Sequence, residues 1–130
     1  MTRYLIGVDT AETAAELVAY MEDRVTEDDT VFVVNSLHGE SRTSDDEVVE
    51  GREATEYVED HLPNADAHQL IRGNSPQEDL VQFADEHDVE ELVIGIRKRS
   101  PTGKLVFGST AQDLLLETPR PTVVVPLTDA

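Results

Sequence analysis

Two spacings of apolar residues follow one another along this chain, and they predict five strands and four helices. Short apolar runs predict buried strands at residues 4–8, 31–34, 65–71, 92–94 and 122–125. Apolar residues three or four positions apart predict amphipathic helices at residues 10–25, 48–62, 76 onward and 109–118. Residues 38–47 are polar and lack either period, which predicts a loop.

The strict alternation of strands and helices predicts an α/β fold. We expect a single domain over residues 1–130, an open three-layer α/β/α arrangement around a five-stranded, mainly parallel, Rossmann-like sheet. The ligand crevice of such a sheet lies beyond the carboxyl ends of its strands, where the strand order reverses. Asp9 follows the first strand and Gly95 ends the fourth, so the two converge if these strands are neighbours.

The chain is strongly acidic, and this charge restricts the classes of molecule that it can bind. The chain has 28 acidic residues against 10 lysines and arginines, a formal net charge of -18. Such self-repulsion destabilises a compact state unless salt screens it, and at molar salt the Debye length is only ~3 Å. The composition resembles that of proteins from extreme halophiles, with an ordinary acidic protein as the alternative. The same charge argues against a DNA or RNA partner, whose phosphates require Lys and Arg.

Other features of the composition concern compartment and covalent chemistry. The chain has no cysteine, hence no disulfide and no thiolate metal site. No apolar stretch approaches ~18 residues, and the N-terminal apolar run is short and breaks at Asp9. We therefore expect a cytoplasmic protein without a membrane partner.

The segment from Gly95 to Thr110 has the layout of a phosphate cradle: strand, glycine loop, Gly-Ser-Thr, helix. A glycine at position 95 lets the backbone approach a ligand, and Gly108 precedes two hydroxyl residues where a helix begins. The alternative is a plain turn with Ser109 as a helix cap. Four of the ten basic residues lie in this segment: Arg97, Lys98, Arg99 and Lys104.

Established catalytic and nucleotide motifs are missing. The first strand lacks a dinucleotide fingerprint, Gly103-Lys104 is followed by Leu105 instead of a hydroxyl residue, and no serine stands in a nucleophile elbow. A response-regulator receiver would need an aspartate where this chain has residues 70–73, LIRG. The four histidines lack ligand spacing. We therefore predict no catalytic residue and no metal ligand of the protein's own.

Four segments together resemble the universal stress protein family, across essentially the whole length. They are the opening strand that closes on Asp9, residues 73–76 (GNSP) before the third helix, the stretch from Gly95 to Thr110, and the proline-flanked last strand at residues 120–126. The nucleotide-binding branch of that family carries Gly, two residues, Gly, nine residues, then Gly-Ser or Gly-Thr. Gly95 and Gly108-Ser109 fit that spacing, and Lys98 replaces the middle glycine.

The resemblance implies an adenine nucleotide alpha hydrolase-like fold with ATP, accompanied by Mg²⁺, at the strand ends. Asp9 would contact the adenosine portion, and Ser36 would line the adenine pocket. Ile94 and Gly95 would pass beneath the nucleotide. The phosphates would be held by Gly108, Ser109 and Thr110.

Lys98 leaves two functions open. A side chain at a position that needs φ > 0 costs about 1–2 kcal/mol and obstructs a cradle. An ammonium beside a polyphosphate instead gains about 1.5–3 kcal/mol, and Arg97 would contribute likewise. The chain is then either an ATP-binding stress-response protein or an interaction module of the same family that binds no nucleotide. Slow ATP hydrolysis needs only phosphate positioning, but no base for water is identifiable.

The last strand predicts an oligomer. Val123, Val124 and Val125 form an apolar run at an expected sheet edge, and an apolar edge invites pairing with another chain. The resemblance likewise implies a homodimer through this strand.

Overall fold

The computed structural model describes residues 1–37, 43–71, 73–96 and 109–127. Strands and helices alternate through these ranges, as the sequence predicts. The strands are β1 (Arg3–Gly7), β2 (Thr30–Leu37), β3 (Ala65–Ile71), β4 (Glu91–Ile96) and β5 (Thr122–Pro126). The helices are α1 (Ala11–Met21), α2 (Asp45–His61), α3 (Pro76–Glu86) and α4 (Ser109–Glu117).

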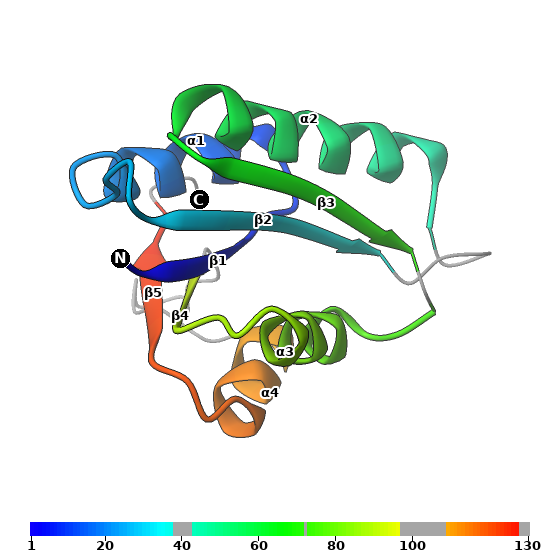
Figure 1. The fold of residues 1–130 in the computed structure, drawn as a ribbon. Coiled ribbons are helices and arrows are strands. Elements are labelled where there is room, and N and C mark those ends of the chain that lie inside the picture. Colours follow the sequence, from blue (N-terminus) through cyan, green and yellow to red (C-terminus); the bar gives the residue numbers. More distant parts are fainter. Residues whose placement is uncertain (38–42, 72, 97–108, 128–130) are drawn as a thin grey trace, which may run out of the picture.

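The five strands form one parallel sheet in the order β3-β2-β1-β4-β5. Helices α1 and α2 lie on one face of the sheet, and α3 and α4 lie on the other (Figure 1). The predicted α/β fold class is therefore confirmed, and β1 and β4 are neighbours. The strand order reverses between them, because β1 leads through α1 to β2 on one side while β4 lies on the other.

Alternation along the strands supplies both layers of the core. In β1, Ile6 packs into the cluster shared with α1 and α2, while Leu5 packs into the cluster shared with α3 and α4. Neighbouring residues of a strand point to opposite faces, so one short run serves both clusters. Both side chains are fully buried.

Helix α2 begins three residues before the predicted position 48, which corrects the sequence analysis. The Ser44 hydroxyl accepts a hydrogen bond from the Glu47 backbone N–H at 3.2 Å, and the Glu47 carboxylate accepts one from the Ser44 N–H at 3.2 Å. This capping box satisfies two backbone donors at the helix start. The acidic residues assigned to a loop instead lie in the first turn, where the helix dipole favours negative charge.

Strand β4 also extends beyond its predicted end. Gly95 lies inside the strand, in register with Val125 of β5, and Ile96 pairs with Pro126. The prediction that the strand ends at Gly95 is therefore wrong by one residue. Within the described ranges, no helix is both long and apolar enough to cross a membrane.

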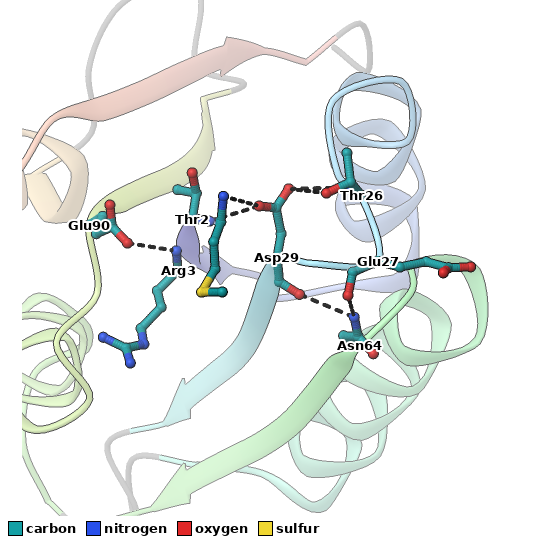
Figure 2. A network of polar contacts seen from close by, with 8 residues as sticks. Thr2, Arg3, Thr26, Glu27, Asp29, Asn64 and Glu90 are labelled. Carbon is teal, nitrogen blue, oxygen red and sulfur yellow. Dashed lines mark hydrogen bonds and ion pairs between the residues drawn. The ribbon is translucent and has the colours of Figure 1, made fainter.

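Asp29 joins the amino ends of three strands (Figure 2). Its buried carboxylate accepts hydrogen bonds from the backbone N–H groups of Thr2 at 2.7 Å and Thr26 at 2.9 Å. Its carbonyl oxygen accepts a bond from the Asn64 side chain at 3.2 Å, and Asn64 also donates to the Glu27 carbonyl. Asn64 has a left-handed φ of 58°, which asparagine tolerates better than most residues. The network holds β1, β2 and β3 together at the end of the sheet opposite Asp9.

Replacing Asp29 with asparagine should lower the free energy of unfolding at neutral pH. The backbone N–H groups of Thr26, and next of Thr2, hold the pKa of the Asp29 carboxyl below its ordinary value. A lowered folded-state pKa stabilises the fold above the unfolded-state value of about 4, and this contribution is lost as pH falls through the folded-state pKa. Urea unfolding of Asp29→Asn should therefore show lower stability at pH 7 and a shallower loss on acidification. The exposed neighbour variant Asp28→Asn is the control, and equal acid profiles for both variants would contradict the assignment.

Candidate functional site

A cleft of ≈ 440 Å³ lies at the carboxyl ends of β1 and β4, where the strand order reverses. This is the position at which parallel α/β sheets bind ligands. Residues from β1, β2, β4 and the helices of both layers line the cleft: Gly7, Val8, Asp9, Thr13, Val34, Ser36, Pro76, Leu80, Ile94, Gly95, Ile96, Thr110, Ala111, Leu114 and Leu127.

Five residues of the site proposed from sequence meet in this cleft. They are Asp9, Ser36, Ile94, Gly95 and Thr110. Ser109 is the first residue of α4. Arg97, Lys98 and Gly108 lie outside the described residues.

The cleft combines apolar walls with a few polar groups. Leu80 of α3 and Leu114 of α4 contribute to one wall, and Leu127 follows β5. Among the lining residues, polar side chains belong to Asp9, Thr13, Ser36 and Thr110. Apolar walls with a small number of convergent polar groups are typical of small-molecule sites.

Asp9 is placed by the start of α1. The Thr10 hydroxyl caps this helix by accepting the Thr13 backbone N–H at 3.3 Å, and the Thr10 N–H donates to Asp9 Oδ1 at 2.8 Å. The preceding residue is fixed from both sides, because the Val8 N–H donates to the Val34 carbonyl at 3.0 Å and its carbonyl accepts the Asn35 amide at 3.0 Å. The exposed carboxylate of Asp9 therefore lies on a rigid segment at the mouth of the cleft.

Asn35 belongs to a buried polar bridge that the sequence did not reveal. Its Oδ1 accepts a hydrogen bond from Gln69 of β3 at 3.1 Å, and Gln69 also donates to the Val48 carbonyl of α2 at 2.8 Å. The amide of Asn35 is almost fully enclosed because α2 approaches it at Gly51, where a Cβ would lie 2.0 Å from Asn35 Oδ1. The bridge links α2 and β3 to the backbone just before Asp9.

Ser36 is held by a buried aspartate that the sequence analysis also missed. Its hydroxyl donates to Asp79 Oδ2 at 2.5 Å, and Asn74 donates to Asp79 Oδ1 at 3.0 Å. Asp79 is 0% exposed. A signal was present in the sequence, because Asp79 occupies the apolar face of α3 together with Leu80 and Phe83.

Gly95 lies close against the side chain of Leu127. A Cβ at this position would lie 2.8 Å from Leu127 Cδ2, closer than real side chains approach. Among the described glycines, only Gly73 has a positive φ, at 78°. The space beside Gly95 is thus filled by Leu127, which itself lines the cleft.

A second, smaller hollow of ≈ 290 Å³ adjoins the cleft and shares Asp9, Ser36 and Pro76 with it. Glu47 and Glu50 of α2 line its far side. Among the described residues that line this hollow, the charged ones are all acidic, so they repel a phosphate and favour groups that donate hydrogen bonds.

Two of the histidines that the sequence left scattered lie together near α3. The His87 ring stacks on Phe83 with centroids 3.9 Å apart, and the His68 ring meets Phe83 at 4.9 Å. Within the described ranges, no group of three His, Asp or Glu residues is arranged to hold a metal ion.

Comparison with known proteins finds similarity along nearly the whole chain. The model of a family described as the universal stress protein family matches residues 1–126. A universal stress protein from Mycolicibacterium smegmatis is 48% identical over 71 residues, which are 52% of this chain and 55% of that protein. The chain thus spans about half the length of this curated relative.

Two solved structures from Archaeoglobus fulgidus match nearly the whole chain. A universal stress protein structure is 38% identical, covers 96% of this chain and 98% of its own, and has a TM-score of 0.78. A universal stress protein in complex with dAMP is 30% identical with the same coverage and a TM-score of 0.70.

Proposed function

Because the chain belongs to the universal stress protein family, we propose that it binds an adenine nucleotide in the cleft between β1 and β4. The observation that carries the proposal is the convergence of Asp9, Ser36 and Gly95 with the start of α4 around one largely apolar cleft. Binding of dAMP by the 30% identical Archaeoglobus fulgidus protein supports the same ligand class here.

The charges along the cleft favour one orientation of the nucleotide. The nucleoside lies toward Asp9 and Ser36, since the acidic hollow beyond them repels phosphate. The phosphates lie toward the start of α4, near Ser109 and Thr110, where the backbone N–H groups of a helix start and the helix dipole favour an anion. Arg97, Lys98 and Gly108 complete the phosphate end in this proposal.

For ATP, a metal ion would be held mainly by the nucleotide. No described side-chain cluster is arranged for a metal, whereas Mg²⁺ is commonly bound through phosphate oxygens and water with few protein ligands. Mg²⁺ is therefore proposed as a companion of ATP and not as a resident ion.

Isothermal titration with ATP, ADP and AMP tests the proposal, run at low and at molar salt because the net charge of -18 supports adaptation to high salt. Asp9→Asn keeps an oxygen for the Thr10 N–H and removes the charge, and it should weaken binding about 10-fold to 100-fold. Asp23→Asn, in the exposed turn after α1, is the matched control and should bind like the wild type.

Absence of binding at either salt concentration would contradict the proposal and favour the alternative, a dimeric interaction module without nucleotide. Lys98→Gly then separates the two readings. A variant that binds where the wild type does not identifies Lys98 as the residue that closed the site.

The second part of the proposal is a homodimer through β5. Among the described residues, β5 is the last strand of the sheet, and half-buried Val123, Val124 and Val125 form its centre. The Pro121 carbonyl and the Leu127 N–H bond to β4, so by alternation the Val124 N–H points to the outer edge. An outward-facing row of this kind is able to pair with a second copy around a two-fold axis.

Val124→Pro should convert the dimer to a monomer, because proline removes an outward N–H while the bonds of β5 to β4 remain. Light scattering at matched concentrations measures the change. Val124→Ala keeps the amide and is the control, so a monomeric Val124→Ala or a dimeric Val124→Pro would contradict pairing through the backbone of β5.

A further inference from the structure

The Ser36 hydroxyl has a single proton, and it donates this proton in a hydrogen bond to Asp79. Ser36 Oγ donates to Asp79 Oδ2 at 2.5 Å, a short bond of the charge-assisted kind. The other carboxylate oxygen accepts the Asn74 amide at 3.0 Å. In the Ser36 bond the hydroxyl is the donor and the carboxylate oxygen of Asp79 is the acceptor.

Burial makes this arrangement rigid. Asp79 is 0% exposed and is anchored in α3, whose first turn is closed by the capping box of Ser75 and Glu78. Ser36 lies at the carboxyl end of β2, in register with Leu70 of β3. The oxygen that Ser36 presents to the cleft therefore offers lone pairs only.

Other side chains near Ser36 are also hydrogen-bond acceptors. Asp9 stands beside Ser36 in both hollows, and Glu47 and Glu50 line the acidic one. The carboxylates of these side chains also present oxygens that accept hydrogen bonds. These oxygens therefore favour a ligand group that donates hydrogen bonds at this end of the site.

We infer that Ser36, with its hydroxyl held by Asp79, makes the cleft select a purine with an amino group at C6 over one with a keto group at C6. This inference rests on the proposed nucleotide function. An amino group donates to Ser36 Oγ, whereas a keto oxygen would face it lone pair to lone pair and leave both acceptors unsatisfied. Ser36 touches the base in this inference, and Asp79 is a positioning residue that acts through Ser36.

AMP and IMP provide the pair of ligands, because they differ at one edge of the purine only: AMP carries an amino group at C6 and an unprotonated N1, whereas IMP carries a keto group at C6 and a proton on N1. Isothermal titration should give a wild-type preference for AMP on the order of 10-fold, the effect of one mispaired, partly enclosed hydrogen-bonding group. Ser36→Ala should remove most of this preference. Asp79→Asn can donate to Ser36 through its amide and release the hydroxyl proton toward the cleft, so it should raise the affinity for IMP relative to AMP.

Asn74→Ala is the matched control. It removes the other hydrogen bond to Asp79 and leaves the Ser36 bond in place, so the ratio of the two affinities should stay at the wild-type value. The ratio is the readout, because a general loss of stability weakens both ligands alike. If Asp79→Asn does not fold by circular dichroism, Ser36→Ala and Asn74→Ala still decide the question.

The outcomes separate this inference from the function on which it rests. A wild type that binds AMP and IMP equally overturns the selection and leaves nucleotide binding intact, whereas a wild type that binds neither overturns both. Titration of 2′-deoxy-AMP tests a contact with the sugar. If Ser36→Ala changes the preference between AMP and 2′-deoxy-AMP but not that between AMP and IMP, then Ser36 faces the ribose and the inference fails.

Discussion

Gly51→Ala is expected to lower the free energy of unfolding by about 2–4 kcal/mol, although alanine is the better helix former. A Cβ at Gly51 would lie 2.0 Å from Asn35 Oδ1 and 2.4 Å from its Cγ, so the buried amide must move. Overpacking alone costs about 1–3 kcal/mol, and the gain in helix propensity offsets about 1 kcal/mol. Displacement of the amide weakens its hydrogen bonds to Val8 and Gln69. Loss of either buried hydrogen bond costs about 1–3 kcal/mol.

Urea unfolding measures this effect, with Glu53→Ala as the control. Glu53 is exposed in the same turn of α2, and its replacement should stay within about 0.5 kcal/mol of the wild type. A double-mutant cycle with Asn35→Ala isolates the cause. If the clash is with Asn35, Gly51→Ala should cost at least about 1 kcal/mol less in the Asn35→Ala background, and equal costs in the two backgrounds would contradict the assignment.

The helices and strands were predictable because the spacing of apolar residues along the chain indicates most of them. β3 matches its predicted range of 65–71 and α3 begins at Pro76 as predicted, since turn residues mark their ends. The start of α2 was missed because its capping residues lie in a run of acids that reads as a solvated loop. Local chemistry at Ser44 and Glu47, and not hydrophobic period, sets that boundary.

The candidate site was predictable in outline only. The rule that parallel strands gather their carboxyl ends brought Asp9 and Gly95 together, and the cleft confirms their proximity. Asp79 was not identified among the 28 acidic residues, because the sequence does not distinguish a buried acid from an exposed one until its tertiary partner is known. Asn35 and Gln69 were missed for the same reason, since their bridge joins residues 34 positions apart.

The sequence explains the glycine at position 95 by close approach of a ligand, whereas the structure places the Leu127 side chain beside it. Substitutions of Leu127 test which explanation holds. Leu127→Ala should lower the free energy of unfolding by about 2–4 kcal/mol, because Leu127 is only 1% exposed and packs into the cluster beneath α1. Gly95→Ala alone should cost about 1–3 kcal/mol through overpacking against the same side chain.

The two substitutions together distinguish packing from ligand approach as the reason for a glycine at position 95. If Leu127 is the reason, a methyl group at 95 enters the space that Leu127→Ala opens, and the double variant should be about as stable as Leu127→Ala alone, as urea unfolding would measure. Nucleotide affinity would then also match that of Leu127→Ala. If the backbone of Gly95 must instead lie against the nucleotide, Gly95→Ala weakens binding by a similar factor in both backgrounds, whatever happens to stability. The first result makes this glycine part of the core that shapes the cleft, because the side chain that excludes a Cβ at 95 is the one that lines the cleft beside it.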